Sequence, residues 1–96
     1  MIEKFFEGYQ LFIYKNRLEL SENVHKFIEN QIKKLTKNKR RFKFCVSGGS
    51  TPKLVYQLLS KSDIAWEMVD IFLGDERCVR PDSEDSNSLM LQNSLL

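Results

Sequence analysis

The residues best suited to chemistry form two short clusters, at positions 47–52 and 75–77. The first is Ser-Gly-Gly-Ser-Thr-Pro, placed after an apolar run and before a helical pattern. Strand, glycine turn and helix in this order form an anion cradle, because glycine lets the backbone approach a ligand and the helix start offers unpaired N–H groups. We expect Thr51 to cap this helix and Pro52 to be its first residue. The cluster predicts a phosphate or small-anion site, although about half of such corners are plain turns.

The second cluster is Asp75, Glu76 and Arg77, which follows the apolar run 69–73. Arg77 can grip a phosphate or carboxylate through two hydrogen bonds. Either acid can hold Arg77, bind sugar hydroxyls or move protons. The alternative is that these charges only pair with one another at the surface. Ligands bind beyond the carboxyl ends of parallel strands, so we expect both clusters to meet at one edge of a sheet.

The elements that must position these clusters follow from hydrophobic periodicity. Residues 42–46 and 69–73 predict strands, and residues 53–59 predict a helix between them. Strand, helix and strand within about thirty residues predict a parallel βαβ unit. Upstream, residues 5–14 predict one strand, or two short strands broken near Gly8, in a sheet covered on both faces.

Helices flank this unit on both sides in the sequence. A capping box of Asn16 and Glu19 opens a helix predicted over residues 17–37, and Ser86 caps a last helix. Apolar residues recur along the first of these at helical spacing: Leu20, Val24, Phe27, Ile28, Ile32 and Leu35. His25, the only histidine, lies beside this stripe, and we expect a partly exposed helix residue rather than a base. Trp66 is expected in or over the core.

Composition excludes several classes of protein. The 96 residues are 42% hydrophobic and 29% charged, which indicates one globular domain at most. A net charge of +2 is too small to indicate a nucleic-acid or membrane partner, and the basic cluster 37–41 lacks interleaved aromatic residues. No apolar run reaches the ~18 residues of a membrane span, and no secretory signal is found. Cys45 and Cys78 form no metal-binding pattern and favour a reducing, cytoplasmic location.

Taken together, the motifs resemble those of the 6-phosphogluconolactonases. The resemblance rests on Ser-Gly-Gly-Ser-Thr-Pro at 47–52, Asp-Glu-Arg-Cys-Val at 75–79, Asp-Ser-Asn at 85–87, and their separation. It implies an α/β fold, a Rossmann-like parallel sheet flanked by helices, shared with glucosamine-6-phosphate deaminases. It also implies hydrolysis of 6-phosphoglucono-δ-lactone to 6-phosphogluconate in the oxidative pentose phosphate pathway. The implied partner is the small phosphosugar lactone, and no metal or organic cofactor is implied.

The resemblance also assigns roles to residues. The residues that would bind the phosphosugar are Gly48, Gly49, Ser50, Thr51 and Arg77. Asp75, one of the two acids that can move protons, is the candidate catalytic residue on that chemistry and not from the resemblance. The family's general base is a histidine in a Gly-His-Thr-Ala-Ser-like motif, which this sequence does not contain. We therefore expect residues 1–96 to be a single partial domain, the N-terminal part of a longer lactonase. We expect it to be nearly inactive alone, since general base catalysis contributes about 10²–10⁴-fold.

Two alternatives stay open. The first is a glucosamine-6-phosphate deaminase or isomerase. Deaminases favour Gly-x-Thr-Pro without the Ser-Gly-Gly opening and Asp-Glu-Tyr in place of Asp-Glu-Arg, so Arg77 favours the lactonase. The second is a non-catalytic product that binds sugar phosphates or nothing, which the missing histidine favours.

Overall fold

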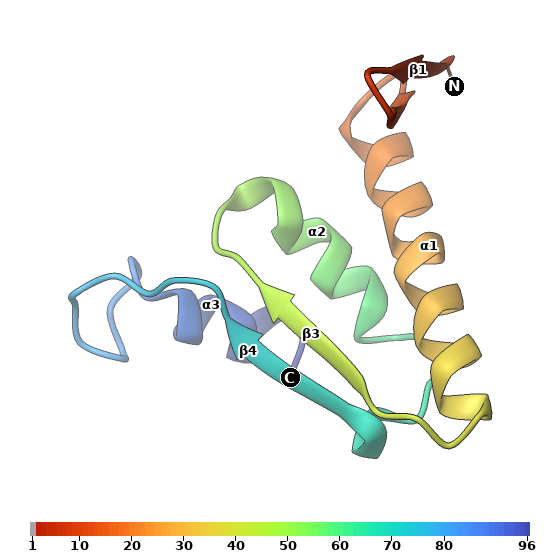
Figure 1. Ribbon diagram of the computed structural model, residues 1–96. Helices are drawn as coiled ribbons and strands as arrows, with labels where there is room; N and C mark the ends of the chain where they lie inside the picture. Colours follow the sequence, from red (N-terminus) through yellow and green to blue (C-terminus); the bar gives the residue numbers. More distant parts are fainter. Residues whose placement is uncertain (1) are drawn as a thin grey trace.

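The computed structural model describes residues 2–96 as an α/β arrangement with two separate two-stranded sheets. Its elements, in chain order, are β1 (Ile2–Phe6), β2 (Tyr9–Ile13), α1 (Arg17–Lys37), β3 (Phe42–Val46), α2 (Ser50–Leu59), the 3-10 turn η1 (Trp66–Met68), β4 (Val69–Leu73) and α3 (Asn87–Ser94). Figure 1 shows β3 and β4 side by side, with α2 between them in the chain.

The β3–α2–β4 segment is the predicted parallel βαβ unit. Its strands pair in register from Phe42 opposite Val69 to Val46 opposite Leu73. At the start of the pair, Arg41 binds both carboxylate oxygens of Asp70, at 2.7 and 2.9 Å. The carboxyl ends of both strands therefore lie at the opposite edge, where the two clusters begin.

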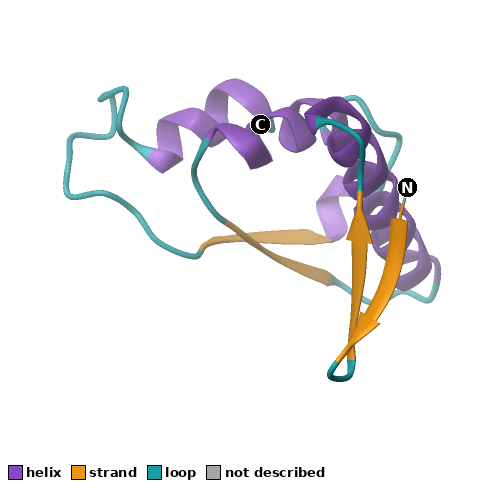
Figure 2. Ribbon diagram, turned by 90° about the horizontal axis from the view of Figure 1, so that it is seen from above, coloured by secondary structure: helices purple, strands orange, loops and turns teal. Residues whose placement is uncertain are grey.

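The core lies between this strand pair and the helices on one of its faces (Figure 2). Alternate residues of each strand point to opposite faces of a sheet. Phe44 and Ile71, which are register partners, pack against the core, whereas their neighbours Cys45 and Phe72 are exposed. The buried core residues come from three elements, and they are Val46 of β3, Val55, Tyr56 and Leu59 of α2, and Leu91 and Leu95 of the α3 region.

Helix α1 has the predicted bounds. Asn16 is its N-cap, and the Asn16 side chain accepts a hydrogen bond of 2.8 Å from the Glu19 N–H. Ile32 is fully buried, and Val24 and Ile28 pack against the core. Phe27, predicted on the same stripe, is 64% exposed. Phe27 instead lines a groove that faces β2, because it lies about 100° around the helix from Ile28.

The N-terminal segment is a hairpin, so the second of the two predicted forms is confirmed. β1 and β2 pair antiparallel, and Glu7 and Gly8 turn the chain with φ of 46° and 84°. Two consecutive residues with positive φ are typical of the type I′ hairpin turn. The expectation of burial on both faces was wrong, since every β2 residue is exposed. The hairpin forms its own sheet, separate from the β3–β4 pair, beyond the first turn of α1 (Figure 1).

Candidate functional site

The first corner of the site joins β3 to α2. Gly49 is the N-cap of α2, with φ 108° and ψ 165°, a conformation that L side chains rarely adopt. The chain therefore enters the helix at Ser50, and the predicted N-cap at Thr51 was wrong. Pro52 is the third helical residue, where its missing N–H is tolerated because first-turn N–H groups have no intrahelical partner. Gly49 has no side chain that could accept a hydrogen bond from the first turn of α2. The N–H groups at the start of this helix therefore lack a side-chain cap and can donate to a ligand.

Gly48 needs to be glycine for a different reason. A Cβ at this position would lie 2.0 Å from Oδ1 of Asn87 and 2.5 Å from its Cγ. The Asn87 side chain therefore occupies the space above Gly48, and Asn87 itself is only 6% exposed. Glycine is needed at position 48 because the Asn87 side chain packs against it, and at position 49 because the turn requires a positive φ.

The second corner is anchored by Glu76. Its Oε1 accepts hydrogen bonds from the N–H of Arg77 at 2.8 Å and of Asn87 at 2.7 Å. Its Oε2 accepts from the Ser88 N–H at 2.8 Å and from the Ser86 hydroxyl at 3.0 Å. The backbone donors of Ser88, Asn87 and Arg77 lower the pKa of Glu76 from 4.5 to about 2. Glu76 therefore holds the start of α3 with both of its carboxylate oxygens, and a role in proton transfer or sugar binding stays a prediction.

Asp75 is held at the edge of this corner by the same asparagine. The Asn87 Nδ2 donates to the Asp75 carbonyl oxygen at 3.1 Å and reaches its Oδ1 at 3.5 Å. Asn87 thus contacts both corners, Gly48 on one side and Asp75 on the other. The only sign of this bridge in the sequence is the Ser-Asn pair of the resemblance.

A cavity of about 260 Å³ lies where the two corners meet. Gly49, Ser50 and Lys53 line it from α2, and Arg77 lines it from the second corner. The predicted convergence of the two clusters is therefore confirmed. Arg77 forms its ion pair with Asp85, with Nη1 3.9 Å from Oδ1, and not with Asp75 or Glu76. Glu84 and Asp85 supply carboxylates to the same cavity.

Not every predicted site residue lies in this cavity. Thr51 lines an apolar groove behind the first corner, together with Ser47 and Tyr56. Gly48 is packed under Asn87, and Asp75 is outside the cavity lining. Lys53 was not predicted as a site residue. The signal for it was its position one turn after Gly49, because residues three and four apart share a helix face.

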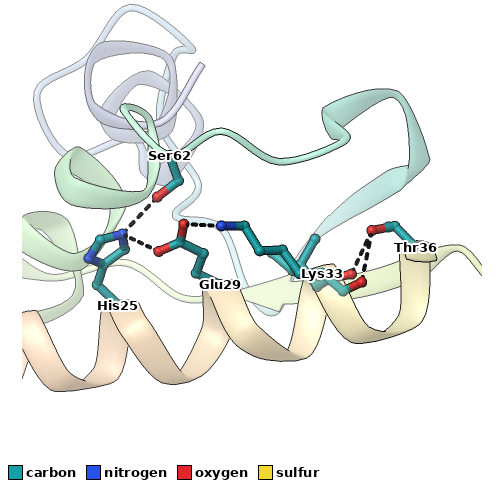
Figure 3. A network of polar contacts seen from close by, with 6 residues as sticks. His25, Glu29, Lys33, Thr36 and Ser62 are labelled. Carbon is teal, nitrogen blue, oxygen red and sulfur yellow. Dashed lines mark hydrogen bonds and ion pairs between the residues drawn. The ribbon is translucent and has the colours of Figure 1, made fainter.

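His25 lies in a separate network, shown in Figure 3. Its Nε2 is 2.7 Å from the Ser62 hydroxyl and 3.4 Å from a Glu29 oxygen, and Lys33 contacts Glu29 at 3.0 Å. Serine, histidine and a carboxylate suggest a catalytic triad, but a triad needs the carboxylate on the other ring nitrogen, Nδ1. The network fastens the loop after α2 to α1. The prediction of a partly exposed helix residue is confirmed, since the His25 side chain is 19% exposed.

Residues 2–96 contain neither a metal-binding cluster nor a membrane-spanning helix. Within this range, no three His, Cys, Asp or Glu side chains are grouped so as to hold a metal ion. No helix in the same range is both long and apolar enough to span a bilayer.

The sequence and fold match one protein family. The family model described as glucosamine-6-phosphate isomerases/6-phosphogluconolactonase matches residues 15–96. The chain belongs to this family. A 6-phosphogluconolactonase of Xylella fastidiosa is 35% identical over 83 residues, which cover 86% of this chain and 35% of that protein. One of Nostoc sp. is 43% identical over 60 residues, which cover 62% of this chain and 25% of that protein.

Solved structures of the same family have the same fold. A crystal structure of a 6-phosphogluconolactonase from Shewanella baltica superposes with a TM-score of 0.81 at 34% identity, over 86% of this chain and 36% of that one. The structure of 6-phosphogluconolactonase from Trypanosoma brucei superposes with a TM-score of 0.79 at 30% identity, over 88% of this chain and 34% of that one. The chain thus spans about a third of the length of these proteins. The expected Rossmann-like α/β fold is confirmed.

Proposed function

We propose that this chain forms the phosphate-binding part of a lactonase that hydrolyses 6-phosphoglucono-δ-lactone to 6-phosphogluconate. The observation that carries the proposal is that Gly49 and Arg77 line one cavity at the carboxyl edge of the parallel strands. Family membership supports it, as does the name of the relatives from Xylella fastidiosa and Nostoc sp.. Residues 1–96 are proposed as a partial domain of this lactonase.

In this proposal the phosphate binds at the start of α2. The backbone N–H groups and hydroxyl of Ser50 donate to phosphate oxygens, and the positive end of the helix dipole favours the anion. Lys53 and Arg77 supply positive charge from two sides of the cavity. The start of α3 is less suited, because Ser86 and Glu76 already accept its first N–H groups.

The sugar would extend from the phosphate toward the acidic side of the cavity. Glu84 and Asp85 are hydrogen-bond acceptors there, suited to sugar hydroxyls. Asp85 also lies close enough to Arg77 to orient its guanidinium. Fixing both ends of the substrate in this way positions the lactone carbonyl for attack.

Lactone opening requires water to attack the carbonyl carbon while a base removes a proton from that water. The tetrahedral oxyanion then collapses, and the ring oxygen leaves and takes up a proton. Asp75, the predicted catalytic residue, precedes Arg77 at this corner but lies outside the cavity lining, so we propose no proton transfer by its carboxylate. His25 does not serve this step, because it is bound to Ser62 after the far end of α2. The contribution proposed for residues 1–96 is therefore binding and orientation of the substrate.

We propose a cytoplasmic location for this reaction. The free cysteines Cys45 and Cys78 are both exposed, and exposed thiols persist in a reducing compartment. The deaminase is the alternative within the same family. Arg77, which the resemblance associates with lactonases, lines the cavity.

Binding of 6-phosphogluconate, measured by calorimetry beside unphosphorylated gluconate, tests the proposal. We expect gluconate to bind at least about tenfold more weakly, because charge-assisted hydrogen bonds contribute about 1.5–3 kcal/mol each. For the same reason Arg77→Gln should weaken 6-phosphogluconate binding about tenfold or more. Lys53→Gln should weaken 6-phosphogluconate binding about fivefold, because it removes one positive charge near the protein surface.

The matched control is Lys61→Gln, which removes the same charge after the far end of α2. Lys61→Gln should leave the dissociation constant within about twofold. Equal binding of gluconate and 6-phosphogluconate, or equal losses in the two lysine variants, would contradict the proposal. Ammonia release from glucosamine 6-phosphate, with no lactone hydrolysis, would favour the deaminase.

A further inference from the structure

The Tyr56 side chain holds the backbone of the first corner from behind. Its hydroxyl donates a hydrogen bond of 2.8 Å to the Ser47 carbonyl oxygen and accepts one of 3.1 Å from the Ser47 N–H. One phenol therefore satisfies both backbone groups of the residue that leaves β3. Tyr56 is 4% exposed, and its ring packs edge-on against Phe44 at 6.3 Å, so the hydroxyl is fixed in place.

We call these two hydrogen bonds between the Tyr56 hydroxyl and the Ser47 backbone the clamp. The position of Ser47 explains why the clamp matters. Ser47 directly precedes Gly48 and Gly49, which have no side chains to anchor the turn. Glycine also loses more conformational freedom on ordering than any other residue. A corner that is ordered before the ligand arrives avoids that cost at the moment of binding.

We propose that Tyr56 is a positioning residue for the anion site, and that its hydroxyl sets the direction in which the corner enters α2. Tyr56 does not line the cavity shared by Gly49 and Arg77. It lines the apolar groove on the other side of the corner, with Ser47 and Thr51. Its effect on binding is therefore exerted through the backbone. The identity of the ligand rests on the proposed function, whereas the clamp itself does not.

The variant Tyr56→Phe removes the hydroxyl and keeps the buried ring. We expect amide exchange at Ser47 in the ligand-free chain to accelerate at least about tenfold, since its hydrogen-bond acceptor is lost. We expect the dissociation constants for 6-phosphogluconate and for inorganic phosphate to rise about 5- to 30-fold. The control is Tyr14→Phe, a half-buried tyrosine at the hairpin end of α1, which should change neither quantity.

The outcomes separate a positioning role from a general loss of stability. Both measurements are made at a temperature where the folded fraction of each variant is complete by circular dichroism. Unchanged dissociation constants in folded Tyr56→Phe would overturn the proposal, even if its melting temperature fell. An equal change in Tyr14→Phe would also overturn it.

The same design separates the clamp from the proposed function. If the wild-type chain binds inorganic phosphate but not 6-phosphogluconate, the proposed function is wrong, and the phosphate affinity of Tyr56→Phe still decides the role of Tyr56. Wild-type exchange rates give a further check without any variant. The Ser47 amide should exchange more slowly than that of Gly49, and equal rates would refute the clamp.

Discussion

Replacing Gly48 by alanine tests whether the two corners of the site are packed together through Asn87. The new Cβ would lie 2.0 Å from Asn87 Oδ1 and 2.8 Å from its Nδ2, so one of the two must move. The asparagine is not free to swing away. It is nearly buried, and its Nδ2 donates to the Asp75 carbonyl oxygen.

The expected cost follows from these contacts. Displacing the amide loses the hydrogen bond to Asp75, worth about 0.5–1.5 kcal/mol. Forcing an extra methyl group into a packed space adds about 1–3 kcal/mol. Alanine has less conformational entropy than glycine in the unfolded chain, and this difference offsets the cost by about 0.4–1 kcal/mol. We therefore expect Gly48→Ala to lower the free energy of unfolding by about 0.5–4 kcal/mol, with a central value of about 2 kcal/mol, compared with the 5–15 kcal/mol typical of a domain.

Urea denaturation followed by circular dichroism measures this change. Gly74→Ala is the milder comparison, because its Cβ would lie 3.3 Å from the Val46 carbonyl oxygen, a tight contact but much longer than the 2.0 Å at Gly48. We expect that variant to cost less than about 1 kcal/mol. Truncating the neighbour with Asn87→Ala removes the clash, so Gly48→Ala in that background should also cost less than about 1 kcal/mol.

The double-mutant cycle decides the question. A coupling energy of about 1–2 kcal/mol between positions 48 and 87 is expected from residues in direct contact. If Gly48→Ala costs the same with and without the Asn87 side chain, the asparagine does not explain the need for glycine. The account of how the two corners are joined would then be wrong.

Three further predictions concern other parts of the chain. The pKa of Glu76 is about 2 in the folded chain, below its ordinary 4.5, so its stabilisation is complete above about pH 4.5 and is lost as the pH falls toward 2. The melting-temperature difference between wild type and Glu76→Gln should therefore narrow over that range, and a constant difference would contradict the anchor role. Ser62→Ala should lower the free energy of unfolding by about 0.5–1.5 kcal/mol through loss of its contact with His25. It should leave 6-phosphogluconate affinity unchanged, and a weakened affinity would show that this network reaches the site. The purified 96-residue chain should hydrolyse the lactone about 10²–10⁴-fold more slowly than a full-length relative in a pH-stat assay, since it lacks the expected base. Equal rates would show that a residue of this chain serves as the base.

Features set by neighbouring residues were predictable from the sequence. The bounds of α1, the two strands of the βαβ unit and the Ser86 cap depend on periodicity and capping within a few residues. Parallel pairing then places both clusters at one edge, so the meeting of Gly49 and Arg77 was also predictable. The motif pattern was specific enough to indicate the family.

Features that depend on distant residues were decided by the tertiary structure alone. Thr51 is a good N-cap by type, but the positive φ of Gly49 starts the helix earlier. The role of Glu76 depends on the N–H groups at the start of α3, those of Asn87 and Ser88, which lie eleven and twelve residues further along the chain. Gly48 is fixed by Asn87, and β2 is exposed because it pairs only with β1. A local sequence pattern determines backbone torsion preferences and the spacing of side chains. These outcomes depend instead on which polar groups and side chains from distant parts of the chain come into contact.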